Sequence, residues 1–231
     1  EISPLLIKTL IATEDQRFYR HAGVDVRSTF SVFFYMIQGK KRGGSTITQQ
    51  LVKNLFKTRA NYSRGLLGHI PFIKIIIYKT KECVNAFKIE LFYTKEEILA
   101  MYLNTVDFGS NSFGIHTAAN SFYSTTPDKL TANQCATLVG MLKAPTLYSP
   151  LINPSNSLNR RNVVLGQMLK QNIISNQEFD SLKSLPLALN TSFDENDEIN
   201  NGYFSDVVAR YLKPWLKKNG YNLYTDGLRI Y

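Results

Sequence analysis

An apolar helix that ends on a carboxylate lies close to the N-terminus and frames the rest of the chain. Ser3 and Pro4 are typical of an N-cap and a first helical position. Apolar side chains then recur at helical spacing, at Leu6, Ile7, Leu10 and Ile11. Glu14 follows Leu10 by four residues, so its carboxylate falls on the stripe that faces a core or a cleft. A glutamate at a helix end can instead point to water, and the spacing leaves both interpretations open.

Positive charge is concentrated in the first hundred residues. They hold 16 Lys and Arg against 8 Asp and Glu, so +8 of the total formal charge of +9 lies there. An anionic partner should therefore meet this part of the chain. No recognised nucleic-acid motif accompanies the charge, so we expect no nucleic-acid partner. Pyrophosphate and anionic lipid head groups suit the same charge.

A glycine-rich turn, Gly43–Gly44, opens a second predicted helix. Ser45 is the expected cap, and the free N–H groups of the first helical turn attract anions. Gln50 and Lys53 follow Thr46 by four and seven residues, which places an amide and an ammonium group on one face. This pattern suits a pyrophosphate and a sugar.

Lys79 and Glu82 share one face of a further predicted helix, three residues apart. Spacing alone favours an exposed ion pair of little energetic value. A pair of charges in a cleft is the alternative.

Five motifs occur in order over residues 1 to 170: Glu14–Gly23, Gly43–Asn54, Lys79–Glu82, Ile98–Asn104 with Phe108–Gly109, and Leu138–Pro145 with Tyr148–Pro150. Together they resemble the signatures of the peptidoglycan glycosyltransferases (glycosyltransferase family 51), the lipid II polymerising domains of class A penicillin-binding proteins. The resemblance implies a mainly α-helical, lysozyme-like domain with two lobes around a cleft. It also implies an enzyme that joins lipid II units into β-1,4-linked glycan strands, with inversion and release of undecaprenyl pyrophosphate.

The resemblance also assigns roles to individual residues. Glu14 is implied as the catalytic base and Glu82 as the second catalytic carboxylate of the cleft. The implied substrate-binding residues are Gly44, Ser45, Thr46, Gln49, Gln50, Lys53, Asn54 and Lys79. Assistance by Mg²⁺ or Mn²⁺ is an option that the resemblance leaves open, whereas no organic cofactor is expected and the metal ligands stay unassigned.

One position departs from the family pattern. Tyr78 stands where an arginine usually precedes the lysine of the third motif. Lysine cannot reproduce the bidentate phosphate contact of a guanidinium group. The residues that could compensate are Lys74, Lys81, Arg59 and Arg64, and the sequence does not choose among them.

The expected organisation is a glycosyltransferase domain over residues 1–189, then a linker and the start of a truncated region toward a transpeptidase over 190–231. No apolar run reaches the roughly 20 residues that span a bilayer. Two shorter apolar, aromatic-rich stretches, Phe30–Ile37 and Ile70–Tyr78, suit either an interfacial position or a buried helix. By resemblance, the protein works at the outer face of the bacterial cytoplasmic membrane, held there by an N-terminal transmembrane helix absent from this chain. Its expected partners are lipid II, the growing lipid-linked strand, the membrane surface and other cell-wall synthesis proteins.

Two rival functions remain. A lysozyme-like glycan hydrolase or lytic transglycosylase also uses carboxylates in a cleft, but it has no pyrophosphate to neutralise, so the cluster of cations argues against it. A module that binds lipid II without turnover is suggested by Tyr78. The presence of Glu14, Glu82, Gln50 and Lys53 argues against that module.

Overall fold

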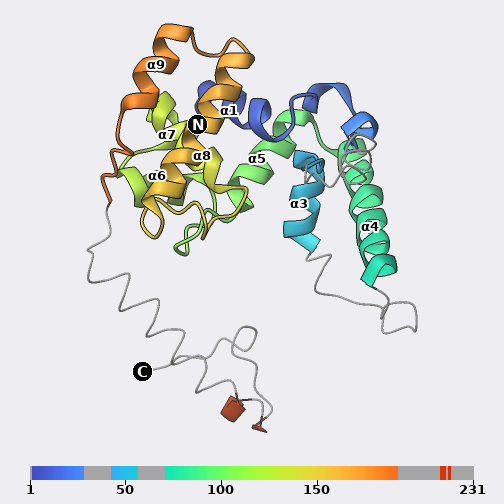
Figure 1. The fold of residues 1–231 in the computed structure, drawn as a ribbon. Coiled ribbons are helices and arrows are strands. Elements are labelled where there is room, and N and C mark those ends of the chain that lie inside the picture. Colours follow the sequence, from blue (N-terminus) through green and yellow to red (C-terminus); the bar gives the residue numbers. More distant parts are fainter. Residues whose placement is uncertain (1, 29–42, 57–70, 192–213, 217, 220–231) are drawn as a thin grey trace. The chain divides into compact units, whose positions relative to one another are not determined.

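The structure is a computed structural model that describes residues 2–28, 43–56, 71–191, 214–216 and 218–219 (Figure 1). By its internal contacts the chain divides into two compact units, Glu1–Asn190 and Thr191–Tyr231. Within the described ranges the first unit is built from helices, and its one β feature is an isolated antiparallel bridge between Asp107 and Phe113. The prediction of a mainly α-helical fold is confirmed. The identity of the region after residue 190 stays a prediction.

The helical elements follow one another with short connections. They are α1 (Pro4–Glu14), η1 (Phe18–Arg20), α3 (Ile47–Phe56), α4 (Pro71–Phe92), α5 (Lys95–Thr105), α6 (Ile115–Tyr123), η3 (Pro127–Lys129), α7 (Ala132–Met141), α8 (Pro154–Lys170) and α9 (Asn176–Ser184).

Local sequence signals explain where several helices begin. The Ser3 hydroxyl accepts a hydrogen bond from Leu5 N, and Pro4 occupies the first helical position of α1. Helices α5, α7 and α9 each begin with a capping box, in which a Thr or Ser side chain and a Glu or Gln three residues later satisfy each other's backbone N–H groups. These ends are therefore fixed by residues next to them in sequence.

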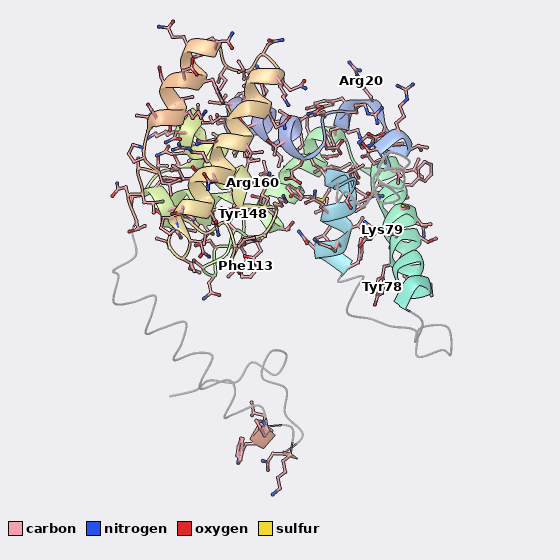
Figure 2. All side chains as sticks on the ribbon, viewed as in Figure 1. Arg20, Tyr78, Lys79, Phe113, Tyr148 and Arg160 are labelled. Atoms are coloured by element: carbon pink, nitrogen blue, oxygen red, sulfur yellow. The ribbon has the colours of Figure 1, made fainter. Side chains whose placement is uncertain are left out.

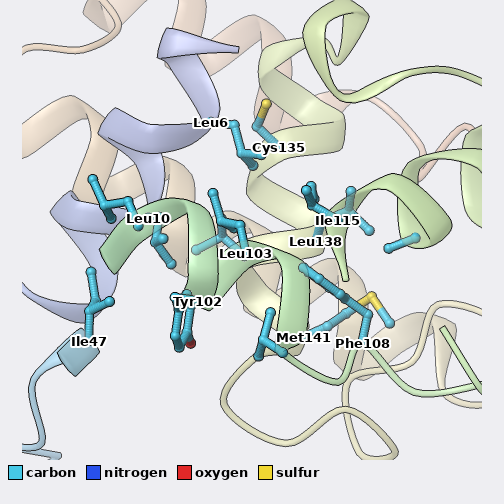
Figure 3. Packing of buried hydrophobic residues seen from close by; sticks show 14 of the residues in the cluster. Leu6, Leu10, Ile47, Tyr102, Leu103, Phe108, Ile115, Cys135, Leu138 and Met141 are labelled. Atoms are coloured by element: carbon cyan, nitrogen blue, oxygen red, sulfur yellow. The ribbon is translucent and has the colours of Figure 1, made fainter. Parts of the chain in front are cut away.

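The helices of the first unit pack in two connected groups. In one group α7 packs against α8 and α1, and α9 packs against α8. In the other, α3 packs against α4 and α5, and α5 also contacts α6. Figure 3 shows apolar side chains of α1, α5 and α7, among them Leu10, Leu103 and Leu138, within one buried cluster. Burial of this cluster is the main source of stability.

A buried arginine fastens the chain after α9 to the helical core. Arg161 on α8 is fully buried, and its guanidinium group donates hydrogen bonds to the carbonyl oxygens of Lys183, Leu185 and Pro186 at 2.7–3.1 Å. Farther on, Asn190 N donates to Phe122 O at 3.1 Å. The first unit is thus closed by backbone contacts up to its last residue.

The apolar stretches of the sequence are resolved only in part. Phe30–Ile37 lies outside the described residues, whereas Pro71 to Tyr78 forms the beginning of α4. Among the described helices, none combines the length and the apolar character needed to cross a membrane.

Candidate active site

The carboxylate of Glu14 lies at the wall of a hollow of about 690 Å³. Glu14 is the last residue of α1 and is half-buried, and its Oε2 accepts a hydrogen bond of 3.0 Å from Gln50 Nε2 on α3. The hollow is lined by Thr13–Arg17, Asp25, Arg27, Ser28, Gly43–Thr46, Gln167, Lys170 and Gln171. Of the two positions that the sequence left open for Glu14, the structure shows the one at a cleft.

Asp15 joins the end of α1 to the start of α3. Its carboxylate is buried and accepts a hydrogen bond from Ile47 N at 3.0 Å. The His21 Nε2 lies 3.0 and 3.1 Å from the two oxygens of the same carboxylate. His21 therefore has the structural role that its sequence context favoured. Asp15 was not singled out from sequence, although it directly follows Glu14.

Thr46, not Ser45, caps α3. The Thr46 hydroxyl accepts from Gln49 N at 3.1 Å, and the Gln49 side chain accepts from Thr46 N at 3.0 Å. This is a capping box, and the Thr46 hydroxyl also donates to Gly23 O at 2.6 Å. The choice of Ser45 as the cap was wrong because Thr46, with Gln three residues later, completes the box.

The capping box changes what the start of α3 can bind. The N–H groups of Ile47 and Gln49 are bound by Asp15 and Thr46, so they are not available to an anion as we expected. Gln49 is buried, and its Nε2 lies 3.1 Å from Cys83 Sγ on α4. This geometry gives Gln49 and the side chain of Thr46 an architectural role rather than a direct contact with substrate.

Gly23 allows the first motif to pack directly on α4. Its φ is +82°, and a Cβ placed there would lie 2.7 Å from the carbonyl carbon and oxygen of Ala86. Only glycine adopts this conformation without strain and leaves room for the neighbouring backbone. The residue thereby fixes the distance between the first motif and the helix that carries Lys79 and Glu82.

Lys79 and Glu82 form a pair on α4 that is not simply a surface ion pair (Figure 2). The Lys79 Nζ lies 2.8 Å from Glu82 Oε2 and donates to Ser45 Oγ at 2.8 Å. Glu82 is 1% exposed, whereas 42% of the Lys79 side chain is accessible. The exposed pair favoured by spacing alone is therefore wrong for the glutamate, and the lysine links α4 to the wall of the hollow.

The structure brings together only part of the predicted set. Gly44, Ser45 and Thr46 line the hollow with Glu14, and Gln50 and Lys79 each contact one of these residues. Lys53 and Asn54 lie half-buried farther along α3, and the hollow as described does not include them. Tyr78 is half-buried beside Lys79 on α4.

This arrangement of motifs matches a known family. The transglycosylase family description matches residues 1–169. The chain belongs to this family. It is 35% identical to penicillin-binding protein 1A of Escherichia coli (strain K12) and 37% identical to penicillin-binding protein 1A/1B of Bacillus subtilis (strain 168), in each case over 100% of the chain. The chain spans about a quarter of the length of these relatives, 25% and 24% respectively.

A solved structure, that of penicillin-binding protein 1A from Haemophilus influenzae, is similar over 51% of this chain and 18% of that chain, with a TM-score of 0.42 and 33% identity. The family match and the relatives confirm the predicted peptidoglycan glycosyltransferase domain of a class A penicillin-binding protein.

The transglycosylase hollow has basic residues that the sequence reasoning missed. Arg17 donates two hydrogen bonds to Asp25, at 2.9 and 2.6 Å. Burial disfavours the charged form of Asp25, but hydrogen bonds from Ser28 and Arg17 and the charge of Arg17 outweigh it, so the pKa of Asp25 lies below its ordinary value. Lys170, at the end of α8, lines the same hollow. Its contribution could not be found by motif, because α8 lies more than 150 residues beyond α1.

The described part of the transglycosylase does not provide a resident metal site. Within it, no group of three or more His, Cys, Asp or Glu side chains is placed to hold a metal ion. The Glu82 carboxylate, a natural candidate, is already bonded to Lys79. These residues do not fit a metal held by the protein alone, so we route no chemical step through one.

Proposed function

We propose that this transglycosylase polymerises lipid II into β-1,4-linked glycan strands, with Glu14 as the general base. The observation that carries the proposal is the place of the Glu14 carboxylate. It lies at the wall of a hollow that also contains the glycine-rich turn before α3, and Lys79 reaches that turn through Ser45. A base and a cation are thus held on two sides of one turn.

The reaction would proceed by direct displacement. The acceptor 4-hydroxyl gives its proton to Glu14 while its oxygen attacks C1 of the donor sugar. The bond between C1 and the pyrophosphate oxygen breaks, and attack from the opposite face inverts the configuration at C1 to β. The undecaprenyl pyrophosphate leaves with the electron pair of that bond.

Cations on the chain would stabilise the leaving group. Lys79 is the best placed, since its side chain is partly accessible and already bonded to the turn. Glu82 would hold Lys79 in position, because the buried carboxylate fixes the ammonium group at 2.8 Å. Lys170, from the opposite end of the sequence, adds positive charge to the hollow. Assistance by Mg²⁺ or Mn²⁺ remains a prediction and would require oxygen ligands from the substrate.

We place this activity at the outer face of the bacterial cytoplasmic membrane. The proposal is supported by the lipid-linked substrate and by large apolar side chains that the second helical group leaves exposed. They include Phe56 of α3 and Phe87, Leu91 and Phe92 of α4. Such side chains suit a bilayer interface. Other cell-wall synthesis proteins are proposed as partners on the strength of the reaction alone.

Product analysis tests the proposal. The chain is incubated with labelled lipid II in detergent and, separately, with preformed glycan, and products are resolved by length. We expect polymer from lipid II, none from the Glu14→Gln variant, and no shortening of preformed glycan. Cleavage of preformed glycan would instead identify a hydrolase. Binding of lipid II without any polymer would indicate a module that does not turn over its ligand.

A further inference from the structure

We infer that Tyr102 is a positioning residue for the reaction: through Gln50, it fixes the orientation of the Glu14 carboxylate. The inference rests on the proposed role of Glu14 as the base. It assigns Gln50 to the carboxylate rather than to the substrate, and it brings in a residue of the fourth motif that the sequence treated as part of an apolar helix face.

The three side chains form a continuous chain of hydrogen bonds across three helices. Tyr102 of α5 donates from its hydroxyl to Gln50 Oε1 at 3.0 Å. Gln50 of α3 donates from Nε2 to Glu14 Oε2 at 3.0 Å. The side chain of Gln50 therefore spans the distance between a fully buried phenol and a carboxylate at the hollow.

Burial fixes the direction of this chain. Tyr102 is 0% exposed, and its place within the apolar cluster is visible in Figure 3. Burial first, and the negative charge of Glu14 second, raise the pKa of Tyr102 well above its ordinary value. The phenol therefore keeps its proton near neutral pH and can act as the donor.

A donating phenol selects one orientation of the Gln50 amide. The amide oxygen must face Tyr102, which turns the NH₂ group toward Glu14. The reversed amide would bring its oxygen against the Glu14 carboxylate, where two acceptors repel each other. Tyr102 and Glu14 thus hold the same amide from both ends, and the rotation of the carboxylate is restricted.

The restriction has a catalytic consequence. The hydrogen bond from Gln50 uses Oε2 of Glu14, so Oε1 is the oxygen that can receive the proton of the acceptor hydroxyl. A base must lie within hydrogen-bond reach of the proton that it removes. The chain of hydrogen bonds preorganises that oxygen without touching the substrate.

Kinetics of the full chain test this inference. Tyr102→Phe removes only the hydroxyl, and we expect kcat to fall about 3- to 10-fold, as for loss of a neutral hydrogen bond, with little change in KM. Gln50→Met keeps the side-chain length, and we expect kcat to fall about 10- to 100-fold, because the lost bond reaches a charged group. In the Gln50→Met background, Tyr102→Phe should add less than about twofold, because the pathway to Glu14 is already broken.

Tyr123→Phe is the matched control, since Tyr123 of α6 is a buried tyrosine outside the hollow, at 3% exposure. It should leave kcat unchanged. Equal losses from Tyr102→Phe in both backgrounds would overturn the inference, as would full kcat in Tyr102→Phe or a change confined to KM.

A spectroscopic measurement keeps the inference testable even if the chain makes no polymer. The side-chain amide signals of Gln50, identified by their absence in Gln50→Met, are followed by NMR in glutamine-labelled protein. Both Tyr102→Phe and Glu14→Gln should shift them, and Tyr123→Phe should not. Unchanged signals in Tyr102→Phe would overturn the inference, whereas failure of polymerisation with shifted signals would count only against the proposed function.

Discussion

The junction between α1 and α3 and the core around α7 are both buried, yet they are built from different side chains. At the junction, buried polar groups such as Asp15, Thr46 and Gln49 bond to one another across the helices. Around α7 the buried side chains are largely apolar, among them Leu138 and Met141. Hydrogen bonds are directional, whereas apolar packing constrains mainly volume. The junction is thus suited to fixing atoms in place, and the α7 core to supplying stability.

Leu138→Ala should have the largest effect on stability, because Leu138 is fully buried within the apolar cluster. We expect the free energy of unfolding to fall by about 2–5 kcal/mol, with kcat little changed at temperatures where the variant stays folded. Denaturant unfolding monitored by circular dichroism measures the loss. Leu147→Ala is the control, since Leu147 is 50% exposed and should cost less than about 0.5 kcal/mol. A large loss of kcat in folded Leu138→Ala would break the division between the two regions.

Asp15→Ala should have a smaller effect on stability and a larger one on the rate. The variant leaves the buried Ile47 N–H without its acceptor, which costs about 1–3 kcal/mol. Loss of this bond also frees the start of α3 and the Gln50 side chain that it carries, so kcat should fall. The same unfolding measurement and the initial rate of polymer formation check both effects.

Two further variants sharpen the result for Asp15. Asp15→Asn keeps an acceptor and should recover most of the stability. Asp180→Ala removes an exposed carboxylate on α9 and should change neither quantity. A rate that stays at the parent value in folded Asp15→Ala would contradict the view that the junction positions the site.

The smallest effect concerns acid stability and the Arg17–Asp25 pair. Because the pKa of folded Asp25 lies below its ordinary value, the pair stabilises the fold above about pH 4, and that contribution is lost as pH falls through the lowered pKa. The difference in unfolding free energy between the parent and Asp25→Asn should therefore shrink as pH falls from 6 toward 2. Denaturant unfolding at several pH values measures it. A difference that grows toward low pH would show that the sign is wrong.

Signals close together in sequence predicted much of the fold. Pro4 at the first position of α1 and the Thr94 and Glu97 capping box of α5 were read correctly, since each signal and its effect lie within one helical turn. The Thr46 and Gln49 box is equally local, and it was missed because Ser45 is also a good capping residue. The error had a physical consequence, because it left the first N–H groups of α3 seemingly open.

The site was predictable only where motifs mark it. The motifs identified Glu14, Lys79 and Glu82, but not the orientation of their side chains. Tyr102 lies 52 residues from the Gln50 that it contacts, and its hydroxyl is hidden among apolar neighbours in the helical pattern. Lys170 reaches the hollow only because α8 packs on α1. Contacts of this kind depend on tertiary packing, which periodicity does not reveal.

The central claim is that Glu14 acts chemically rather than structurally, and a comparison of two glutamates tests it most directly. Glu90 of α4 is also a poorly accessible carboxylate, but it bonds to Lys95 and Thr48 inside the fold. The initial rate of lipid II polymerisation and the unfolding free energy are measured for the parent, Glu14→Gln and Glu90→Gln. We expect Glu14→Gln to lose about 10²- to 10⁴-fold in rate with its stability retained, and Glu90→Gln to lose stability with its rate retained. A folded Glu14→Gln that polymerises at the parent rate would contradict the claim.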